Sequence, residues 1–452
     1  MQVAVVGAGP AGFYTAGGLL ASGLDIQVDL IERLPTPWGL VRQGVAPDHP
    51  NIKAVSRVFD EIAARDGFRF LGNVQVGRDV SAFELSRLYH AVVYAVGASD
   101  DRRLGIPGED LPGSLASASF VAWYNGHPDY CSLSPDLSCT TALVVGNGNV
   151  ALDVARILAI DPGELATTDI ADHALRALRA SAIREIVVLG RRGPAQASFT
   201  TPELRELGEL NGVAAVVDPA ELAIDTPDHA PARRNLETLR TWAAAPAATG
   251  SRTVRLLFCH SPAALLGDGK VEAAEIVHNR LERHPDGTVV AVPTGETEVI
   301  PCGLVLRSVG YRGAPPDGVP LDERTGTIRN RAGRVEPGVY CCGWIKRGPT
   351  GIIGTNKKDA GETVDRILED ARAGLLHAAP VAPPGAIDDL LASRGVVVVD
   401  GDGWQRIDAL ERERGVVEGR PRVKLCRWSD LLVAAHPEPV AAGYGVSRTD
   451  EP

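Results

Sequence analysis

Two glycine-rich turns in the chain have the residue types and spacing that bind a dinucleotide. The first is Gly7-Ala8-Gly9-Pro10-Ala11-Gly12, and the second is Gly146-Asn147-Gly148-Asn149-Val150-Ala151. Each follows an apolar run and precedes a segment of helical spacing. In such a turn the first glycine permits the tight bend, the second lets the backbone approach a pyrophosphate, and the third lets the helix pack on the strand. Because backbone N–H groups at the start of the helix bind the anion, both turns predict a dinucleotide site.

The residue that ends the next apolar run selects the dinucleotide at the first turn. Glu32 stands twenty residues after Gly12, directly behind the run Val28 to Ile31. A carboxylate there accepts hydrogen bonds from a ribose hydroxyl and repels a 2′-phosphate. The first turn therefore suits FAD or NAD rather than NADP. The alternative is a structural turn without a ligand.

The second turn is followed by the opposite charge. Its next apolar strand, Ile183 to Leu189, ends in Gly190-Arg191-Arg192-Gly193. Two guanidinium groups offer charge-assisted, bidentate contacts to a phosphate, so this site predicts NADPH. The interval from Gly146 to Arg191 is longer than usual, with the excess in a helix-like stretch over residues 161–179. The alternative is a solvated arginine pair at a strand end.

Two other segments carry titratable side chains. Residues 200–207 predict a helix start, capped by threonine and with Pro202 in the first turn. Glu203 and Glu206 then share one face of that helix. His49 lies in a proline-flanked loop. On residue type alone, acids in a first turn stabilise the helix by interacting with its dipole, and a histidine in a loop is usually exposed without a functional role.

Composition limits the class of protein. A chain of 452 residues favours two domains, and 46 basic against 57 acidic residues give a net charge of −11, which disfavours general nucleic-acid binding. We expect no membrane span, because no apolar run approaches the roughly 18 residues that a span needs, and no leader, because a strand-like segment begins at Gln2. The odd number of cysteines, seven, argues against a disulfide framework and favours a cytoplasmic location. No metal site is expected.

The order of the segments indicates an insertion. A buried-strand pattern over residues 91–98 precedes the second turn, and two more apolar runs, at 302–309 and 338–343, follow it. We expect an α/β protein with two Rossmann-like dinucleotide-binding domains. Residues 1–105 and 313–452, the latter with a C-terminal extension, form the predicted FAD-binding domain, and residues 106–312 form the NADP-binding domain inserted into it.

Read together, these segments resemble the adrenodoxin-reductase-like NADPH–ferredoxin reductases, and most closely their bacterial members. The resemblance covers almost the whole chain. It is carried by the strings LPTPWGLVR (34–42), GVAPDHP (44–50), GNGNVALDVAR (146–156), VLGRRGP (188–194), RSVGYRG (307–313) and GWIKRGPTGIIGTN (343–356).

The resemblance implies a set of residues for each coenzyme. For FAD these are Gly7, Gly9, Ala11, Gly12, Glu32, Leu40, Val74, Trp344, Gly351, Ile352 and Ile353. For NADP they are Arg102, Asn147, Gly148, Asn149, Val150, Arg191, Arg192 and Glu203, with Gly351 near the nicotinamide. Trp344 stands where many two-dinucleotide flavoproteins have an aspartate on the ribityl chain, as this family has it.

The resemblance also implies a reaction and a partner. Hydride passes from NADPH to FAD, and single electrons then pass to a ferredoxin-type iron–sulfur protein. His49 and Glu206 become active-site neighbours that tune the site or handle protons. Arg205, Arg233, Arg234 and Arg240 match the basic docking segment, although Glu237 among them leaves a solvated helix face as the alternative.

Two other functions remain open from the sequence. A flavin-dependent monooxygenase or oxidase would use the same two coenzymes, but no additional substrate pocket can be recognised in the sequence. A non-catalytic NADPH-binding redox sensor would keep the fold without turnover. Purified protein without flavin absorption bands would favour the sensor.

Overall fold

The computed structural model describes residues 1–244, 251–376, 382–383 and 385–437. It divides into a first unit, of residues 1–101, 125–131 and 310–452, and a second unit, of residues 102–124 and 132–309. The boundaries expected from the sequence fell after residues 105 and 312, and the match of each unit to one coenzyme stays a proposal. The expected α/β class with two Rossmann-like domains is confirmed.

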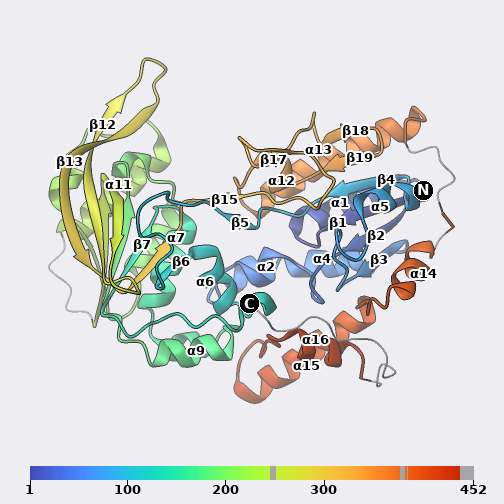
Figure 1. Cartoon of the computed structure of the whole chain (residues 1–452), viewed down its shortest axis with the longest axis horizontal. Helices are drawn as coiled ribbons and strands as arrows, with labels where there is room; N and C mark the ends of the chain where they lie inside the picture. Colours follow the sequence, from blue (N-terminus) through green and yellow to red (C-terminus); the bar gives the residue numbers. More distant parts are fainter. Residues whose placement is uncertain (245–250, 377–381, 384, 438–452) are drawn as a thin grey trace. The chain divides into compact units, whose positions relative to one another are not determined.

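The first unit is built on a largely parallel sheet of six strands in the order β18-β19-β4-β1-β2-β3 (Figure 1). Only β18 runs antiparallel to its neighbour. The central strands are apolar throughout because both faces are covered, as a parallel sheet requires. The strands are β1 (Gln2–Val6), β2 (Gln27–Ile31), β3 (Phe68–Leu71), β4 (Ala91–Tyr94), β18 (Arg334–Glu336) and β19 (Val339–Cys341).

Alternate residues of this sheet enter two different cores. Val3 and Val5 pack with one cluster, to which the helices α1, α4, α13, α15 and α16 contribute, whereas Ala4 and Val6 pack with the other, under α5 and α14. These helices are α1 (Pro10–Leu20), α4 (Ser56–Ala63), α5 (Ala82–Leu88), α13 (Ile353–Arg372), α14 (Ala386–Ser393), α15 (Gly401–Glu418) and α16 (Trp428–Ala435).

Short elements complete the first unit. The chain leaves it after β5 and returns in β15, and these two strands pair antiparallel. The short elements are α2 (Leu40–Gln43), α3 (Pro50–Lys53), β5 (Asp100–Asp101), the 3₁₀ turn η1 (Pro128–Tyr130), β15 (Tyr311–Arg312), β16 (Leu321–Asp322), β17 (Thr327–Ile328) and α12 (Trp344–Arg347).

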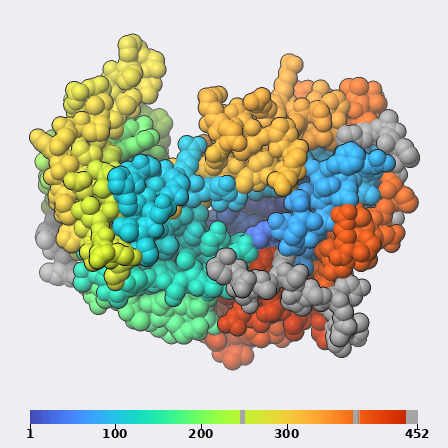
Figure 2. Space-filling view, in the orientation of Figure 1, coloured from blue at the N-terminus to red at the C-terminus, as the bar shows by residue number. Residues whose placement is uncertain are grey.

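The second unit has a six-stranded sheet, all parallel, in the order β6-β14-β7-β8-β10-β9. An antiparallel sheet, β11-β12-β13, contributes to the same core, and its β12–β13 hairpin is the yellow projection of this unit in Figure 2. The strands are β6 (Ser114–Ala116), β7 (Thr141–Val145), β8 (Glu185–Gly190), β9 (Val213–Val217), β10 (Arg252–Phe258), β11 (His260–Leu266), β12 (Ala273–Arg283), β13 (Val289–Pro301) and β14 (Leu304–Arg307).

Helices cover the parallel sheet of the second unit. The long interval after the second glycine turn contains α8 and α9, which accounts for its extra residues. The helical elements are α6 (Ser117–Tyr124), α7 (Asn149–Ala159), α8 (Pro162–Leu165), α9 (Asp172–Arg179), η2 (Pro194–Gln196), α10 (Thr201–Gly208), η3 (Pro219–Leu222) and α11 (Ala230–Ala244). Within the described part of the chain, no helix has the length and apolar character to span a membrane.

A buried ion pair fastens the C-terminal helices to the rest of the first unit. Both Nη atoms of Arg42 donate to the Glu411 carboxylate, at 2.9 and 2.6 Å. Arg422 Nη1 and the backbone N–H of Leu425 donate to the same carboxylate. Burial alone would raise the pKa of Glu411, but the charges of Arg42 and Arg422 hold it below its ordinary value. The pair joins α2 to α15, which are far apart in sequence.

The ion pair gives a stability prediction. Glu411→Ala leaves Arg42 and Arg422 buried without their carboxylate, so we expect the free energy of unfolding of this unit to fall by about 3–5 kcal/mol. Urea denaturation followed by tryptophan fluorescence measures it. Glu413→Ala, at an exposed position of the same helix, is the control and should change stability by less than about 0.5 kcal/mol. Equal, small losses in both variants would contradict the assignment.

Candidate functional site

The first glycine turn lies where β1 ends and α1 begins. Gly7 has a φ of +105°, and a Cβ on it would lie 2.5 Å from the Ala95 carbonyl oxygen. A Cβ on Gly12 would lie 2.0 Å from the Gly7 oxygen, so both positions require glycine. Gly9 is the N-cap of α1, and no described atom lies within 4 Å of a Cβ placed there. The turn thus leaves open space before the helix amides, where a pyrophosphate binds.

Glu32 lies beside this turn, as the sequence predicts for a ribose-binding acid. Its Oε2 accepts the Ala8 N–H at 2.8 Å and its Oε1 accepts the Leu34 N–H at 3.0 Å. Each carboxylate oxygen keeps a further lone pair for a hydroxyl group. Val74 is 1% exposed, and its N–H donates to the Glu32 carbonyl. Val74 therefore supports the backbone of Glu32.

Two further loops contact the turn at positions where only glycine fits. A Cβ on Gly39 would lie 2.8 Å from Gly9 Cα, and one on Gly343 would lie 2.6 Å from Ala11 Cβ. Leu40, directly after Gly39, is 45% exposed, and Ile352, the N-cap of α13, is 70% exposed. Exposed apolar side chains next to a dinucleotide turn fit an aromatic ring system such as a flavin.

A second buried ion pair fixes α12 against α13. Lys346 Nζ lies 2.9 Å from Asp359 Oδ1, and Asp359 Oδ2 accepts the Gly343 N–H. The side chains of Lys346 and Asp359 are 5% and 7% exposed. Trp344 follows Gly343 directly, and its ring lies 5.8 Å from that of Tyr311. The ion pair thereby sets the position of Trp344 and of the start of α13.

The second glycine turn repeats this geometry in the second unit. Gly146 has a φ of +127°, and a Cβ on it would lie 2.1 Å from the Ser308 oxygen. Gly148 is the N-cap of α7, with no described atom within 4 Å of a Cβ placed there. Asn149 Oδ1 accepts the Thr200 N–H at 2.8 Å. The Asn147 carbonyl accepts the N–H groups of residues 198 and 199. The turn is therefore fastened to the loop before α10.

The remaining coenzyme residues lie in the same unit. Arg191 and Arg192 follow β8, with Arg191 exposed and Arg192 half-buried. Arg102 is exposed at the beginning of this unit, and Glu203 is half-buried in the first turn of α10. The two candidate catalytic residues come from different units, because His49 is the N-cap of α3 and Glu206 is in α10.

The helix start predicted for α10 is confirmed, but the predicted threonine side-chain cap is wrong. Thr200 occupies the N-cap position, but its hydroxyl makes no capping hydrogen bond within the described residues. Asn235 of α11 stabilises the helix start instead. Its Oδ1 accepts the Thr201 hydroxyl at 2.6 Å, and its Nδ2 donates to the Phe199 carbonyl at 3.1 Å. The sequence could not show this, because Asn235 is distant along the chain.

The four arginines of the expected docking segment have different surroundings. Arg205, Arg233 and Arg234 are exposed on α10 and α11. Arg240 is also exposed, but its Nη2 donates to the carbonyls of Leu222 and Ile224, at 3.1 and 2.9 Å. Arg240 therefore holds the chain after β9 in place in addition to any contact with a partner.

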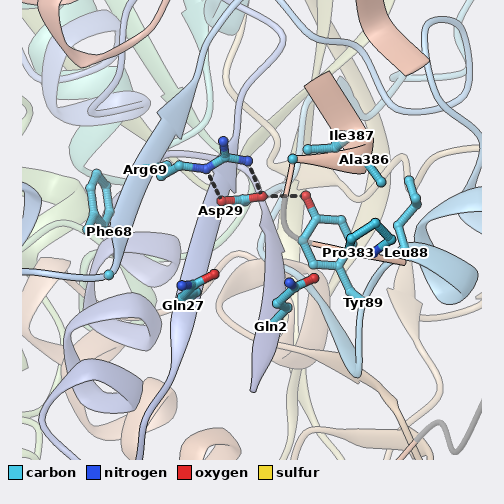
Figure 3. Close-up of a pocket in the computed structure, with 12 residues that line it drawn as sticks. Gln2, Gln27, Asp29, Phe68, Arg69, Leu88, Tyr89, Pro383, Ala386 and Ile387 are labelled. Atoms are coloured by element: carbon cyan, nitrogen blue, oxygen red, sulfur yellow. Dashed lines mark hydrogen bonds and ion pairs between the residues drawn. The ribbon is translucent and has the colours of Figure 1, made fainter. Parts of the chain in front are cut away.

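A cavity of about 320 Å³ in the first unit lies at the beginnings of β1, β2 and β3, and Figure 3 shows the side chains that line it. The glycine turn follows the other end of β1. It contains the Asp29 carboxylate, which accepts two hydrogen bonds from Arg69 and one from the Tyr89 hydroxyl at 2.6 Å. Burial and the Asp29 charge raise the pKa of Tyr89. Because its polar groups bond one another at the edge away from the turn, this cavity is not the coenzyme site.

A titratable pair, Glu221 and His260, lies near the arginine turn, which is the segment Gly190 to Gly193 at the end of β8. No pattern in the sequence indicates this pair. Glu221 Oε2 accepts the Phe258 N–H at 2.9 Å, and its Oε1 lies 4.0 Å from His260 Nδ1. Burial raises the pKa of Glu221 to about 7 and lowers that of His260. Cys259, between Phe258 and His260, donates its N–H to the Arg192 carbonyl. Glu221 thus titrates near neutral pH close to this turn.

Comparisons with known proteins agree with this geometry. The family model described as pyridine nucleotide-disulphide oxidoreductase matches residues 1–187. The chain is 51% identical to NADPH-ferredoxin reductase FprA of Mycobacterium tuberculosis over 446 residues, covering 95% of this chain and 98% of the relative. It is 44% identical to mitochondrial NADPH:adrenodoxin oxidoreductase of Arabidopsis thaliana, covering 96% and 95%. The structure of Mycobacterium tuberculosis FprA in complex with NADPH superposes with a TM-score of 0.93 at 50% identity, covering 96% and 99%.

The raised pKa of Glu221 gives a pH-dependent stability prediction. A carboxyl group with a folded pKa of about 7 stabilises the fold below its ordinary value near 4.5 and loses that contribution as the pH rises through 7. Glutamine stays neutral, so Glu221→Gln should match the native protein at pH 5 and melt about 2–4 °C higher at pH 8.5. Differential scanning fluorimetry measures both. Glu209→Gln, at an exposed position, should show no such pH dependence, and a pH-independent effect of Glu221→Gln would refute the assignment.

Proposed function

Since the chain belongs to the family of NADPH–ferredoxin reductases that includes FprA and the mitochondrial adrenodoxin oxidoreductases, we propose that it reduces a ferredoxin-type iron–sulfur protein with electrons from NADPH. It is an FAD-containing, NADP-dependent oxidoreductase. One observation carries the proposal: the two glycine turns have the same backbone geometry, but the strand after the first ends in an acid and the strand after the second ends in two arginines.

FAD belongs to the first unit in this proposal. The residues that hold it are Gly7, Gly9, Ala11, Gly12, Glu32, Leu40, Val74, Trp344, Gly351, Ile352 and Ile353. When bound, FAD supplies the conversion of two-electron chemistry with NADPH into single-electron chemistry with an iron–sulfur protein. Leu40 and Ile352 exclude water from that chemistry, since both have exposed apolar side chains. The 20-residue helix α13 begins at Ile353, so its positive end stabilises negative charge at the same place.

NADPH belongs to the second unit. The residues that hold it are Arg102, Asn147, Gly148, Asn149, Val150, Arg191, Arg192 and Glu203, with Gly351 of the first unit near the nicotinamide. Gly148 leaves room for the pyrophosphate before α7, and the arginine pair recognises the 2′-phosphate. The same phosphate is repelled by Glu32 in the first unit. Charge at the strand ends therefore keeps the two coenzymes in separate sites.

His49 and Glu206 handle protons in this proposal. Hydride carries two electrons and one proton, so loading and unloading a flavin also exchanges protons with water. A histidine changes charge near neutral pH, which suits a proton-handling or tuning role. His49 is half-buried, which limits its contact with solvent. Neither residue is required as a nucleophile.

The partner surface is the exposed part of α10 and α11. Ferredoxins are acidic, and the chain itself has a net charge of −11, so attraction has to come from a local basic patch. Arg205, Arg233 and Arg234 supply it, and Arg240 adds charge while bonding the carbonyls of Leu222 and Ile224. A cytoplasmic location also stays part of the proposal, supported by the seven cysteines, which are all free thiols.

Coenzyme selection gives one prediction. Changing Arg191 and Arg192 together to serine should raise the KM for NADPH about 100-fold, because two charge-assisted contacts to the 2′-phosphate are lost. The KM for NADH should change by less than about threefold. Ferricyanide reduction with each coenzyme measures both. Arg283→Ser, at an exposed position of the same unit, is the control. Equal losses for NADPH and NADH would refute the assignment.

Electron delivery gives another prediction. NADPH-driven reduction of cytochrome c should rise severalfold when a ferredoxin from the same organism is added. Arg233→Ser with Arg234→Ser should slow that rate by about three- to tenfold at low ionic strength and less at high ionic strength, since salt screens exposed charge. Ferricyanide reduction and the Arg283→Ser variant are the controls.

The outcomes separate the docking surface from the reaction. If the double variant slows both acceptors alike, the patch is not a docking surface. If ferredoxin gives no increase with the native protein, the proposed acceptor is wrong.

A further inference from the structure

Asn279 of β12 contacts the arginine turn that follows β8. Its side chain is buried, with the residue 2% exposed. Its Nδ2 donates to the Arg191 carbonyl at 3.0 Å and to Ser261 Oγ at 2.8 Å. A carbonyl oxygen can only accept a hydrogen bond, so the amide must present its nitrogen to Arg191. Asn279 thus fixes the peptide group between Arg191 and Arg192.

The next peptide group of the turn is fixed as well. The Cys259 N–H donates to the Arg192 carbonyl at 3.1 Å, and the Asn279 N–H donates to the Cys259 carbonyl at 2.6 Å. Cys259 has a φ of +55°, which turns the chain from β10 into β11. Both peptide groups that flank Arg192 are therefore held. Because they define the direction of the Cα–Cβ bond, the direction of the Arg192 side chain is set by these contacts.

A β-bulge in the antiparallel sheet positions Asn279 next to the arginine turn. The pairing of β12 with β13 shifts register between Val277 and Asn279. On β13 the shift leaves residues 294–296 out of the ladder, with Gly295 at a φ of +87° and Thr294 Oγ1 donating to the His278 carbonyl at 2.9 Å. Bulges re-aim side chains next to functional sites. Here the bulge lies next to the residue that meets the arginine turn.

We propose that Asn279 is a positioning residue for coenzyme selection, because it holds the turn on which Arg191 and Arg192 face the 2′-phosphate of NADPH. This inference rests on the proposed function of the arginine pair. A guanidinium group contacts phosphate through two parallel N–H groups, so its contribution depends on its direction. The pyrophosphate is held by a different turn, at Gly146 to Val150, whereas the Asn279 side chain bonds Arg191 and Ser261. Loss of Asn279 therefore affects NADPH and spares NADH.

Asn279→Leu tests the inference, since leucine has a similar size but no N–H donor. We expect the KM for NADPH to rise about tenfold, with kcat unchanged and the KM for NADH changed by less than about twofold. Inhibition by adenosine 2′,5′-bisphosphate, a probe of the 2′-phosphate site, should weaken by the same factor, whereas inhibition by 5′-AMP should not change. A residue with only a structural role would move both coenzymes together.

Two further variants keep the test decisive. Arg283→Ser changes an exposed residue of the same strand β12 away from the bulge, and should leave the NADPH to NADH ratio unchanged. Ser261→Ala removes the other acceptor of Asn279 Nδ2. It should raise the KM for NADPH by about twofold, which gives a reading if Asn279→Leu does not fold.

A double-mutant cycle separates this inference from the proposal that Arg191 and Arg192 bind the 2′-phosphate. In a background with Arg191 and Arg192 both changed to serine, Asn279→Leu should add no further loss for NADPH. If it adds its full tenfold loss there, or if it changes NADPH and NADH equally in the native background, Asn279 does not act through the arginines. If the arginine changes themselves fail to discriminate NADPH from NADH, the proposed phosphate site fails first, whatever Asn279 does.

Discussion

The structure depends on the close approach of a helix start to the end of a parallel strand. In both units the first glycine of the turn lies against a backbone carbonyl that follows the neighbouring strand, where a Cβ would come within 2.5 Å at Gly7 and 2.1 Å at Gly146. No side chain fits there, and both residues have positive φ values. The approach lets helix amides face a pyrophosphate without an intervening side chain. It says nothing about which dinucleotide binds, so that choice falls to other residues.

In the proposed function that choice is made at the end of the strand that follows each glycine turn, β2 in the first unit and β8 in the second, and different contacts hold these two strand ends. Glu32 is held by the N–H group of Leu34, two residues further along, and by that of Ala8 in the glycine turn. The arginine turn is instead held by Asn279 of β12 and by Cys259, the residue between β10 and β11. A short acid is positioned by neighbouring backbone, whereas long arginine side chains need their backbone fixed from outside. The antiparallel sheet β11-β12-β13 supplies that support.

Local patterns predicted the parts of the site that depend on local physics. The glycine turns, the apolar strands and the acid or arginines behind them lie close together along the chain, and the turns and strands are where the sequence predicts them. The threonine cap of α10 failed because Asn235, from another helix, bonds Thr201 and Phe199 instead. Asn279, Glu221 and Glu411 left no signal, since each acts through a partner at least 37 residues away along the chain. The sequence showed that Arg240 is basic but could not show that it bonds two backbone carbonyls.

Side chains from the C-terminal part of the first unit support a strained residue that is bonded to the first glycine turn. Trp38 has a φ of +83°, a conformation that costs an L-residue roughly 1–2 kcal/mol. Its N–H donates to the Ala8 carbonyl of the glycine turn at 2.8 Å, so the strained residue is bonded to the turn itself. Its ring packs edge-on against Trp404 at 4.9 Å, with Arg422 over its face at 5.6 Å. Aromatic and cation–π contacts of this kind contribute about 0.5–1.5 kcal/mol each. These contacts are large enough to offset the strain. The backbone that leads to Leu40 therefore keeps its shape because Trp404 of α15 and Arg422 pack against Trp38.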